Sequence, residues 1–315
     1  MLGGLLLVNQ LLRSPYKLER LWVDAQLQRA DFEVMIYEED QWDLAVYTNR
    51  SQLSLENEAE PTPGDNAELA PIMLLHDLGS DSHSWYPLLE QSAFENHPIY
   101  MVDFYGHGRS RVYVDPEAVQ AISLDLRPEG LAESVLTAVQ EVQQPMVIIG
   151  HGLGAWVGSI FAAKYPDRVA QLIGINPAGV DHVIEPSSFF PKSLEEMTAY
   201  QSLTLPSGAF QLTSVYLDDR LEHALRIEKD NGGVVHQMIE DLTVSLPLTT
   251  STLPTTSSSF LWGTPDSIYP IDSYGKRFQS VFARAKHTLL DGCGHAPQLE
   301  CSELVATELG RMISK

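Results

Sequence analysis

The stretch MVIIGHGLGAWVG, residues 146–158, places a cluster of glycines between a short apolar run and a run of helix-forming residues. The apolar run has the length and composition of a buried strand, and the residues after it those of a helix. Gly150, Gly154 and Gly158 recur every four residues, a spacing that lets a helix cross closely over a strand. The stretch therefore predicts a sharp strand–turn–helix unit centred on Gly152.

Similar units lie on both sides of this one. Short apolar runs, each bounded by Gly, Pro or polar residues, occur at 72–75, 99–103, 146–149, 172–175, 258–262 and 286–290. Helical patterns occur at 84–94, 129–142, 153–164, 274–282 and 303–313. Buried strands that alternate with helices need crossover connections. The pattern therefore predicts an α/β fold with a mostly parallel, doubly wound sheet of about eight strands.

The remaining segments complete the domain organisation. An amphipathic helix is predicted near the N-terminus at 5–28, followed by a β-hairpin at 32–38 and 42–49 and a loop rich in acidic residues at 51–70. A polar stretch rich in Pro, Ser and Thr then interrupts the alternation and is predicted as an inserted helical cap. The expected parts are a leading helix in 1–30, a first core part in 31–179, the cap in 180–256 and a second core part in 257–315.

Composition limits the classes of partner. The chain has 315 residues, a formal net charge of −22 and a pI of about 4.7. Nucleic acids and anionic membranes need clustered Lys and Arg, so neither is an expected partner. Peripheral membrane contact through the N-terminal helix stays an alternative. Cys293 and Cys301 form no zinc-binding pattern, and no metal or cofactor is expected. A cytoplasmic location is predicted, and the oligomeric state is open.

Polar and glycine-rich motifs follow the predicted strands, at the edge where ligands of parallel sheets gather. They are His76-Asp77-Leu78-Gly79, Asp103-Phe104-Tyr105-Gly106-His107-Gly108, Gly150-His151-Gly152-Leu153-Gly154, Gly263-Thr264-Pro265-Asp266 and Asp291-Gly292-Cys293-Gly294-His295. Together, and in this order, the motifs resemble those of the α/β-hydrolase superfamily, in its cap-bearing, small-molecule branch.

The resemblance implies a role for each motif. The family's order of nucleophile, acid and histidine places position 152, Asp266 and His295 in a catalytic triad. In such a triad His295 takes the proton of the nucleophile, and Asp266 orients the imidazole and offsets its charge. The backbone N–H groups of Leu78 and Leu153 are implied as the oxyanion hole. The supporting residues implied around them are His76, Gly79 and His151.

Two departures from the family pattern bear on function. Gly152 stands where the family has its nucleophile, and a glycine cannot attack a carbonyl. Asp77 replaces the glycine that usually follows the family's first histidine. A carboxylate there would oppose negative charge developing in an oxyanion hole. Since its side chain is free to point away, this second departure is given little weight.

Three interpretations follow. In the first, the protein is a non-hydrolytic descendant that binds a small apolar or ester-like molecule, or a partner protein. In the second, it is an enzyme that uses the pair His295 and Asp266 as a general base without a cofactor. In the third, it is a carboxylic-ester or acyl hydrolase whose nucleophilic serine is replaced in this copy. Cys293 is weighed as a substitute nucleophile and is expected to be a packing residue instead.

Overall fold

The computed structural model describes residues 14–50, 69–113, 124–181, 189–205 and 212–313. The first part of the predicted N-terminal helix and nearly all of the acidic loop at 51–70 lie outside these residues. Within the described residues, no helix has the length and apolar character needed to cross a bilayer.

A nine-stranded sheet forms the centre of the molecule, in the order β1-β2-β4-β3-β6-β7-β8-β9 with β5 paired to β2. The β1–β2 hairpin and the β2–β4 pair are antiparallel, and β4, β3 and β6 to β9 run parallel. The strands are β1 (Glu33–Glu38), β2 (Trp42–Thr48), β3 (Ile72–Leu75), β4 (Ile99–Val102), β5 (Arg111–Val112), β6 (Met146–His151), β7 (Val169–Ile175), β8 (Ser258–Thr264) and β9 (Lys286–Asp291). The predicted doubly wound, mostly parallel sheet is confirmed. The additional strand, β5, has two residues, too few to give a sequence pattern.

Helices cover both faces of the sheet because its central strands are apolar on both sides. In β3, Met73 and Leu75 belong to the core cluster that includes α5 and α6, whereas Ile72 and Leu74 belong to the cluster that includes α2 and α13. The longer helices are α2 (Pro15–Arg29), α5 (Pro128–Ala138), α6 (Leu153–Lys164), α8 (Leu194–Thr204), α9 (Ser214–Asp230), α10 (Val234–Val244), α11 (Lys276–Val281) and α13 (Ser302–Ile313). The short helical turns are η1 (Ser82–Trp85), α4 (Tyr86–Leu89), η2 (Ser92–Phe94), η3 (Pro166–Arg168), η4 (Ile271–Gly275) and α12 (Pro297–Glu300).

One predicted helix is broken. The segment 84–94 folds as η1, α4 and η2 rather than as one helix. Pro87 lies in the first turn of α4 and has no N–H to continue the hydrogen bonds of the preceding turn. Gln91 is extended and separates α4 from η2. The segment therefore follows the strand end as a chain of short turns.

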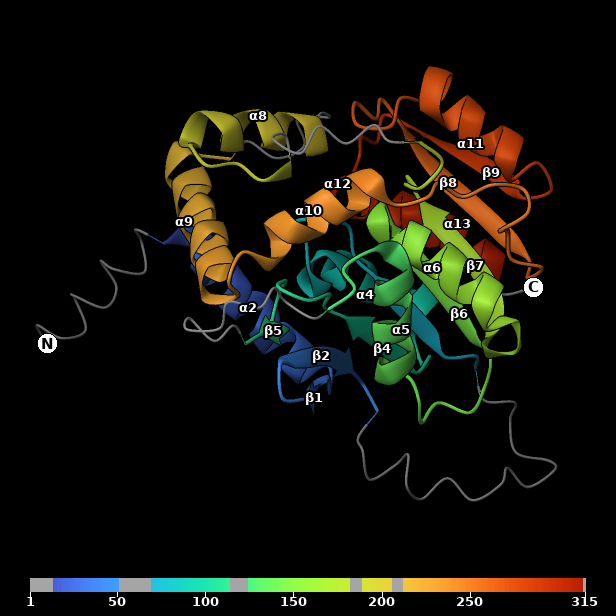
Figure 1. Cartoon of the computed structure of the whole chain (residues 1–315), viewed down its shortest axis with the longest axis horizontal. Coiled ribbons are helices and arrows are strands. Elements are labelled where there is room, and N and C mark those ends of the chain that lie inside the picture. The colour runs from blue at the N-terminus through green and yellow to red at the C-terminus, as the bar shows by residue number, and fades with distance from the viewer. Residues whose placement is uncertain (1–13, 51–68, 114–123, 182–188, 206–211, 314–315) are drawn as a thin grey trace, which may run out of the picture.

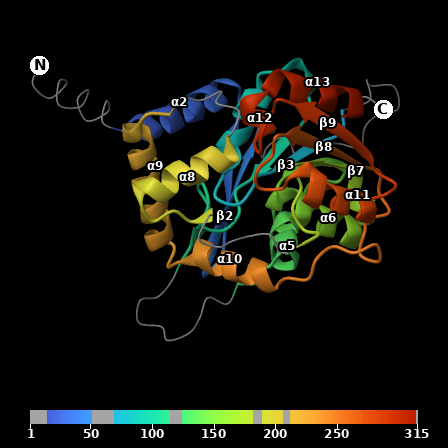
Figure 2. The same ribbon diagram turned by 90° about the horizontal axis from the view of Figure 1, so that it is seen from above.

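Helices α8, α9 and α10 are inserted between β7 and β8 and lie to one side of the sheet, as Figures 1 and 2 show. Helix α2 runs beside α9 in both views. The rings of Tyr16 and Tyr216 meet edge to face at 5.5 Å between centroids, and the Lys17 backbone N–H donates to Asp219 Oδ2 over 3.0 Å. The N-terminal helix therefore packs against the inserted helices as well as the core.

Cys293 was expected to be a packing residue, but it forms a disulfide with Cys301. Cys293, which is fully buried, and Cys301 have Cα atoms 6.0 Å apart and lie at either end of the segment that contains α12. The turn after β9 brings them together, although eight positions separate them in the sequence. Cys293 is therefore no free thiol, and it cannot serve as a substitute nucleophile while the bond is intact.

Candidate active site

The turn between β6 and α6 is as sharp as its glycines predict. Gly152 has a φ of +51°, a conformation that side chains other than glycine rarely adopt. Its carbonyl oxygen accepts hydrogen bonds from the N–H groups of Ala155, Trp156 and Ala178, so the turn is fixed from several directions. A Cβ atom at Gly154 would overlap the backbone of Leu75, which explains the close approach of α6 to β3.

His295 and Asp266 lie within hydrogen-bond distance, as the motif order predicts. The Nδ1–H of His295 donates to Asp266 Oδ2 over 3.0 Å. The other oxygen of Asp266 accepts the backbone N–H groups of Ile268 and Tyr269 at 2.8 and 3.0 Å, which fixes the orientation of the carboxylate. Both side chains are buried, with His295 1% and Asp266 5% exposed. The catalytic role of the pair stays a prediction.

The carboxylate of Asp77 fills the space above Gly152. A Cβ atom at position 152 would come within 3.0 Å of three atoms of this carboxylate, a separation that real Cβ atoms essentially never show. Asp77 Oδ1 accepts the Leu153 N–H at 2.7 Å, and Oδ2 accepts the Nε2–H of His295 at 2.9 Å. The expectation that this side chain could be given little weight is wrong: it contacts both the glycine turn and the imidazole.

The three buried groups form a charged Asp–His–Asp arrangement. Burial by itself would lower the pKa of His295, but the charges and hydrogen bonds of Asp266 and Asp77 raise it to about 10. Burial by itself would raise the pKa of Asp77, but the hydrogen bond from His295 and nearby positive charge lower it to about 2. At neutral pH, His295 is therefore an imidazolium held between two carboxylates, with no lone pair free to accept a proton.

We expect His295 to remain doubly protonated through neutral pH. In ¹⁵N spectra of histidine-labelled protein, both ring nitrogens of His295 should keep the shifts of protonated nitrogen from about pH 6 to about pH 9, because its pKa is raised to about 10. His151 serves as the internal control, since burial lowers its pKa to about 4 and it should stay neutral. Titration of His295 near its ordinary pKa of 6.5 would contradict this arrangement.

The other predicted site residues surround this group. Leu78 lines a cavity together with Asp77 and His295, and the Leu153 N–H is already bonded to Asp77. The Nε2–H of His151 donates to the His295 carbonyl at 2.7 Å. His76 links two strand ends, since its Nδ1–H donates to the Asp77 carbonyl at 2.7 Å and its Nε2 accepts the Phe104 N–H at 2.9 Å.

Gly79 turns the chain after β3, with a φ of +71°, and its N–H donates to His107 Nε2 at 3.1 Å. A Cβ atom there would meet the Tyr200 hydroxyl at 3.1 Å, so the glycine leaves room for an inserted helix to approach.

Two buried amides that support the loop carrying His295 were not predicted from the sequence. Asn176, at the end of β7, donates to the carbonyls of Gly294 and His295 at 2.9 and 2.8 Å and accepts the Gly263 N–H at 2.7 Å. Gln298 donates its Nε2–H to His151 Nδ1 at 2.9 Å. Neither residue belongs to a strand-end motif. The only local signal was a polar residue at the end of the apolar run 172–175.

Asp77, His151 and His295 are the group of described residues that could hold a metal ion, with ligand atoms within 4.8 Å of one another. Each of these atoms already has a hydrogen-bond partner within the protein. A metal ion would have to displace the proton shared by His295 and Asp77 and also release His151 from its bonds. The ligand atoms of these three side chains are therefore all engaged in hydrogen bonds within the protein.

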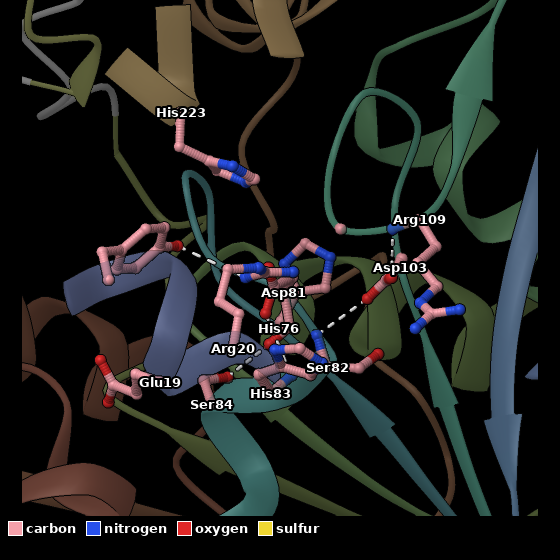
Figure 3. Close-up of polar contacts among 12 residues, drawn as sticks. Glu19, Arg20, His76, Asp81, Ser82, His83, Ser84, Asp103, Arg109 and His223 are labelled. Carbon is pink, nitrogen blue, oxygen red and sulfur yellow. Dashed lines mark hydrogen bonds and ion pairs between the residues drawn. The ribbon is translucent and has the colours of Figure 1, made fainter. Parts of the chain in front are cut away.

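A second polar cluster fixes the loop after β3. Figure 3 shows Arg20 of α2 directed at Asp81, with which it forms an ion pair. Asp103 accepts the N–H groups of Ser82 and Arg109, each at 2.8 Å. Burial opposes ionisation of Asp81, but Arg20 lowers the pKa of that carboxyl. These contacts anchor the leading helix to the strand ends.

Two adjoining cavities lie between the strand ends and the inserted helices. The inner one is lined by Asp77, His295 and residues of α8, and the outer one by Gly79, Ser80 and Asp81 of the core and by residues of α8, α9 and α10. Both are lined by Ser80, Tyr200 and Arg220. The imidazolium group thus faces a space roofed by the inserted helices.

Most of the chain matches one known protein family. A model described as "Alpha/beta hydrolase family" matches residues 72–308. The chain is similar to human (Lyso)-N-acylphosphatidylethanolamine lipase, 27% identical over 114 residues, and to human 1-acylglycerol-3-phosphate O-acyltransferase ABHD5, 30% identical over 115 residues. Each match covers 35% of this chain and 30% of the relative, so the chain matches about a third of the length of these relatives.

Solved structures resemble the chain over nearly its whole length. A putative lipase from Acinetobacter baumannii has a TM-score of 0.73 at 17% identity and covers 94% of this chain and 95% of its own. A membrane phospholipase A, described as a bacterial virulence factor, has a TM-score of 0.71 at 18% identity and covers 100% of this chain and 98% of its own. At these identities the likeness concerns the fold.

Proposed function

Because this chain belongs to the α/β-hydrolase family, which its match over residues 72–308 establishes, we propose that it is a non-hydrolytic member that binds a small apolar molecule. Position 152 is the family's nucleophile position, and here it holds a glycine. The Asp266–His295 pair remains but serves to hold Asp77. We also propose that the chain divides into a core, formed by residues 31–179 and 257–315, and a cap, formed by residues 180–256.

The contacts of Asp77 are the observation that carries this proposal. A carboxylate bonded to both the Leu153 N–H and His295 Nε2 occupies the place where an attacking oxygen and an oxyanion would meet. Developing negative charge beside it would be repelled, and the N–H donor is already in use. Because Gly152 has no side chain, the space above it is open, and the Asp77 carboxylate fills that space.

This arrangement weighs against the two alternatives. A general base must be unprotonated at the working pH, whereas the carboxylates raise the pKa of His295 to about 10. A hydrolase altered only at its serine would keep an open oxyanion site, whereas Asp77 fills that space here. Both oxygens of Asp77 are bound, which favours the role of counterion over that of a carboxylate nucleophile.

We expect the unaltered chain to remain unlabelled by a fluorophosphonate and to leave short aryl esters intact. The physical reason is that His295 Nε2 is bonded to Asp77 instead of to a hydroxyl, and that the Leu153 N–H is bonded to Asp77 as well. Intact-mass spectrometry detects any adduct, and a serine esterase treated in parallel shows that the reagent is active. Labelling at any residue, or an ester adduct on Asp77, would contradict the proposal.

The proposal also covers the class of ligand that the protein binds and the cellular compartment in which it is found. Relatives named as a lipase and an acyltransferase favour a ligand with acyl or ester character. An intrachain disulfide is typical of proteins that fold in an oxidising compartment. The Cys293–Cys301 bond therefore weighs against the predicted cytoplasmic location. Leu21 and Trp22 are half-exposed on α2, which keeps membrane contact through this helix as an alternative.

A further inference from the structure

Arg220 of α9 forms no ion pair within 4 Å with a carboxylate of the described residues, although the Asp81 carboxylate, which pairs with Arg20, acts on it electrostatically. Its side chain is partly buried and lines both cavities. One guanidinium nitrogen donates to Gln201 Oε1, and the group lies over the Tyr200 ring at 5.6 Å from the centroid. Both contacts are neutral. A desolvated guanidinium is most stable when bonded directly to a carboxylate or phosphate. Because Asp81 is bonded to Arg20 instead, Arg220 has no such bond among the described residues.

The groups around Arg220 are also donors. Gln201 is 8% exposed, and its Nε2 atom is buried with no hydrogen-bond partner among the described residues. Burial raises the pKa of Tyr200 to about 12, so its hydroxyl keeps its proton at neutral pH. Buried donors without acceptors are destabilising. Arg220, Gln201 and Tyr200 thus present a surplus of donors where the two cavities meet.

Apolar side chains line the outer cavity beyond this point. They are Phe189, Phe190, Pro191, Met197, Ile227 and Val235. The two cavities have volumes of about 80 and 50 Å³. A water molecule needs about 10–15 Å³ of such space, so together they hold roughly ten water-sized groups. This capacity suits a short or medium-length chain with a small headgroup.

We propose that the cavity beneath α8 and α9 binds an apolar carboxylic acid, with the carboxylate on Arg220 and Gln201 and the chain among the apolar side chains. This inference rests on the proposed ligand-binding function and names its ligand class. A free acid meets the guanidinium with two charge-assisted hydrogen bonds, whereas an ester offers only neutral acceptors. The ligand therefore resembles the product of an ester hydrolase rather than its substrate.

Octanoate and octanamide, which share chain length and differ in charge, test this inference on the whole chain. By isothermal titration calorimetry, octanoate should bind about tenfold or more tightly than octanamide, the range expected for charge-assisted hydrogen bonds. Acetate should bind more weakly than octanoate, because it has no chain to bury. Equal affinity for octanoate and octanamide, or for octanoate and acetate, would overturn the proposal without any variant.

Variants locate the site. Arg220→Gln should lower octanoate affinity about tenfold or more and leave octanamide affinity unchanged. Lys229→Gln, on the exposed side of the same helix, is the matched control and should change neither. Unchanged octanoate affinity in Arg220→Gln would overturn the proposal. If octanoate binding fails while the chain stays unlabelled by fluorophosphonate, this inference falls and the absence of serine catalysis stands.

Discussion

The double variant Asp77→Gly with Gly152→Ser is expected to react with a fluorophosphonate and to hydrolyse short aryl esters, whereas Gly152→Ser alone should do neither. Glycine at position 77 removes the carboxylate and frees the Leu153 N–H. Loss of one of its two carboxylates lowers the pKa of His295, so the imidazole becomes neutral at a lower pH. Its Nε2 is then free to accept the proton of a serine at position 152. In the single variant, Asp77 still occupies the space that the serine needs.

The size of the gain follows from what a nucleophile contributes. Loss of the serine in another triad hydrolase costs about 10⁶ in turnover, so even partial recovery should raise ester hydrolysis on the order of 10³-fold over the unaltered chain. Initial rates with an aryl acetate, together with intact mass after labelling, provide the measurement. A double variant that folds but stays inert would show that Asp77 is not what blocks the site.

The free energies of unfolding of two glycine variants separate the cost of steric overlap from the cost of backbone strain. Gly152→Ser should lower the free energy of unfolding by about 2–4 kcal/mol, through its positive φ and the overlap with Asp77. Gly292→Ser is the matched control, because Gly292 has a φ of +81° and a Cβ atom added there would meet nothing within 4 Å. Urea unfolding should give Gly292→Ser the smaller loss, because it carries the strain of a positive φ without the overlap.

Asp77→Asn is expected to lower the free energy of unfolding by about 3–5 kcal/mol near pH 5.5. Removing one member of a buried charged pair leaves the other without compensation. The Leu153 N–H and the protonated Nε2 of His295 both need acceptors, and an asparagine amide offers only one oxygen to the two of them. The corresponding fall in melting temperature is on the order of 10 °C.

The stability lost in Asp77→Asn depends on pH, and the pKa shifts of Asp77 and His295 determine at which pH the loss is largest. The pKa of Asp77 falls from 3.8 to about 2 on folding, so its contribution is present above about pH 4 and is lost as pH falls toward 2. The pKa of His295 rises from 6.5 to about 10, so its contribution is present below about pH 6.5 and is lost as pH rises toward 10. The difference between the unaltered chain and Asp77→Asn should therefore be largest between about pH 4 and 6.5.

An exposed carboxylate provides the control for this series. Asp125 pairs with Arg127 at 2.7 Å, and its side chain is 40% exposed. Solvent screens such a pair, so Asp125→Asn should cost less than about 1 kcal/mol at every pH tested. Equal losses for Asp77→Asn and Asp125→Asn at pH 5.5 would mean that His295 and Asp77 are not a buried charged pair.

Local patterns in the sequence were enough to predict the sheet and its strand ends. The apolar runs at 72–75 and 146–149 became β3 and the start of β6, and the helix predicted at 153–164 became α6 with those bounds. Such elements depend on residue periodicity and on glycines within one turn, which neighbouring residues decide. The resemblance of the strand-end motifs to those of the α/β-hydrolase superfamily implied that Asp266 and His295 would meet, and their side chains lie within hydrogen-bond distance.

What the sequence by itself determined is thus the fold and the positions of Gly152, Asp266 and His295 after the strands that carry them. Only the tertiary structure decided that Asp77 turns toward Gly152, that Cys293 meets Cys301, and that Arg220 lies at the junction of two cavities. Asp77 and His295 are 218 positions apart. No local pattern fixes the direction of a side chain just beyond a strand. The packing of separate strand ends and helices does so, and here it places a carboxylate against an imidazolium.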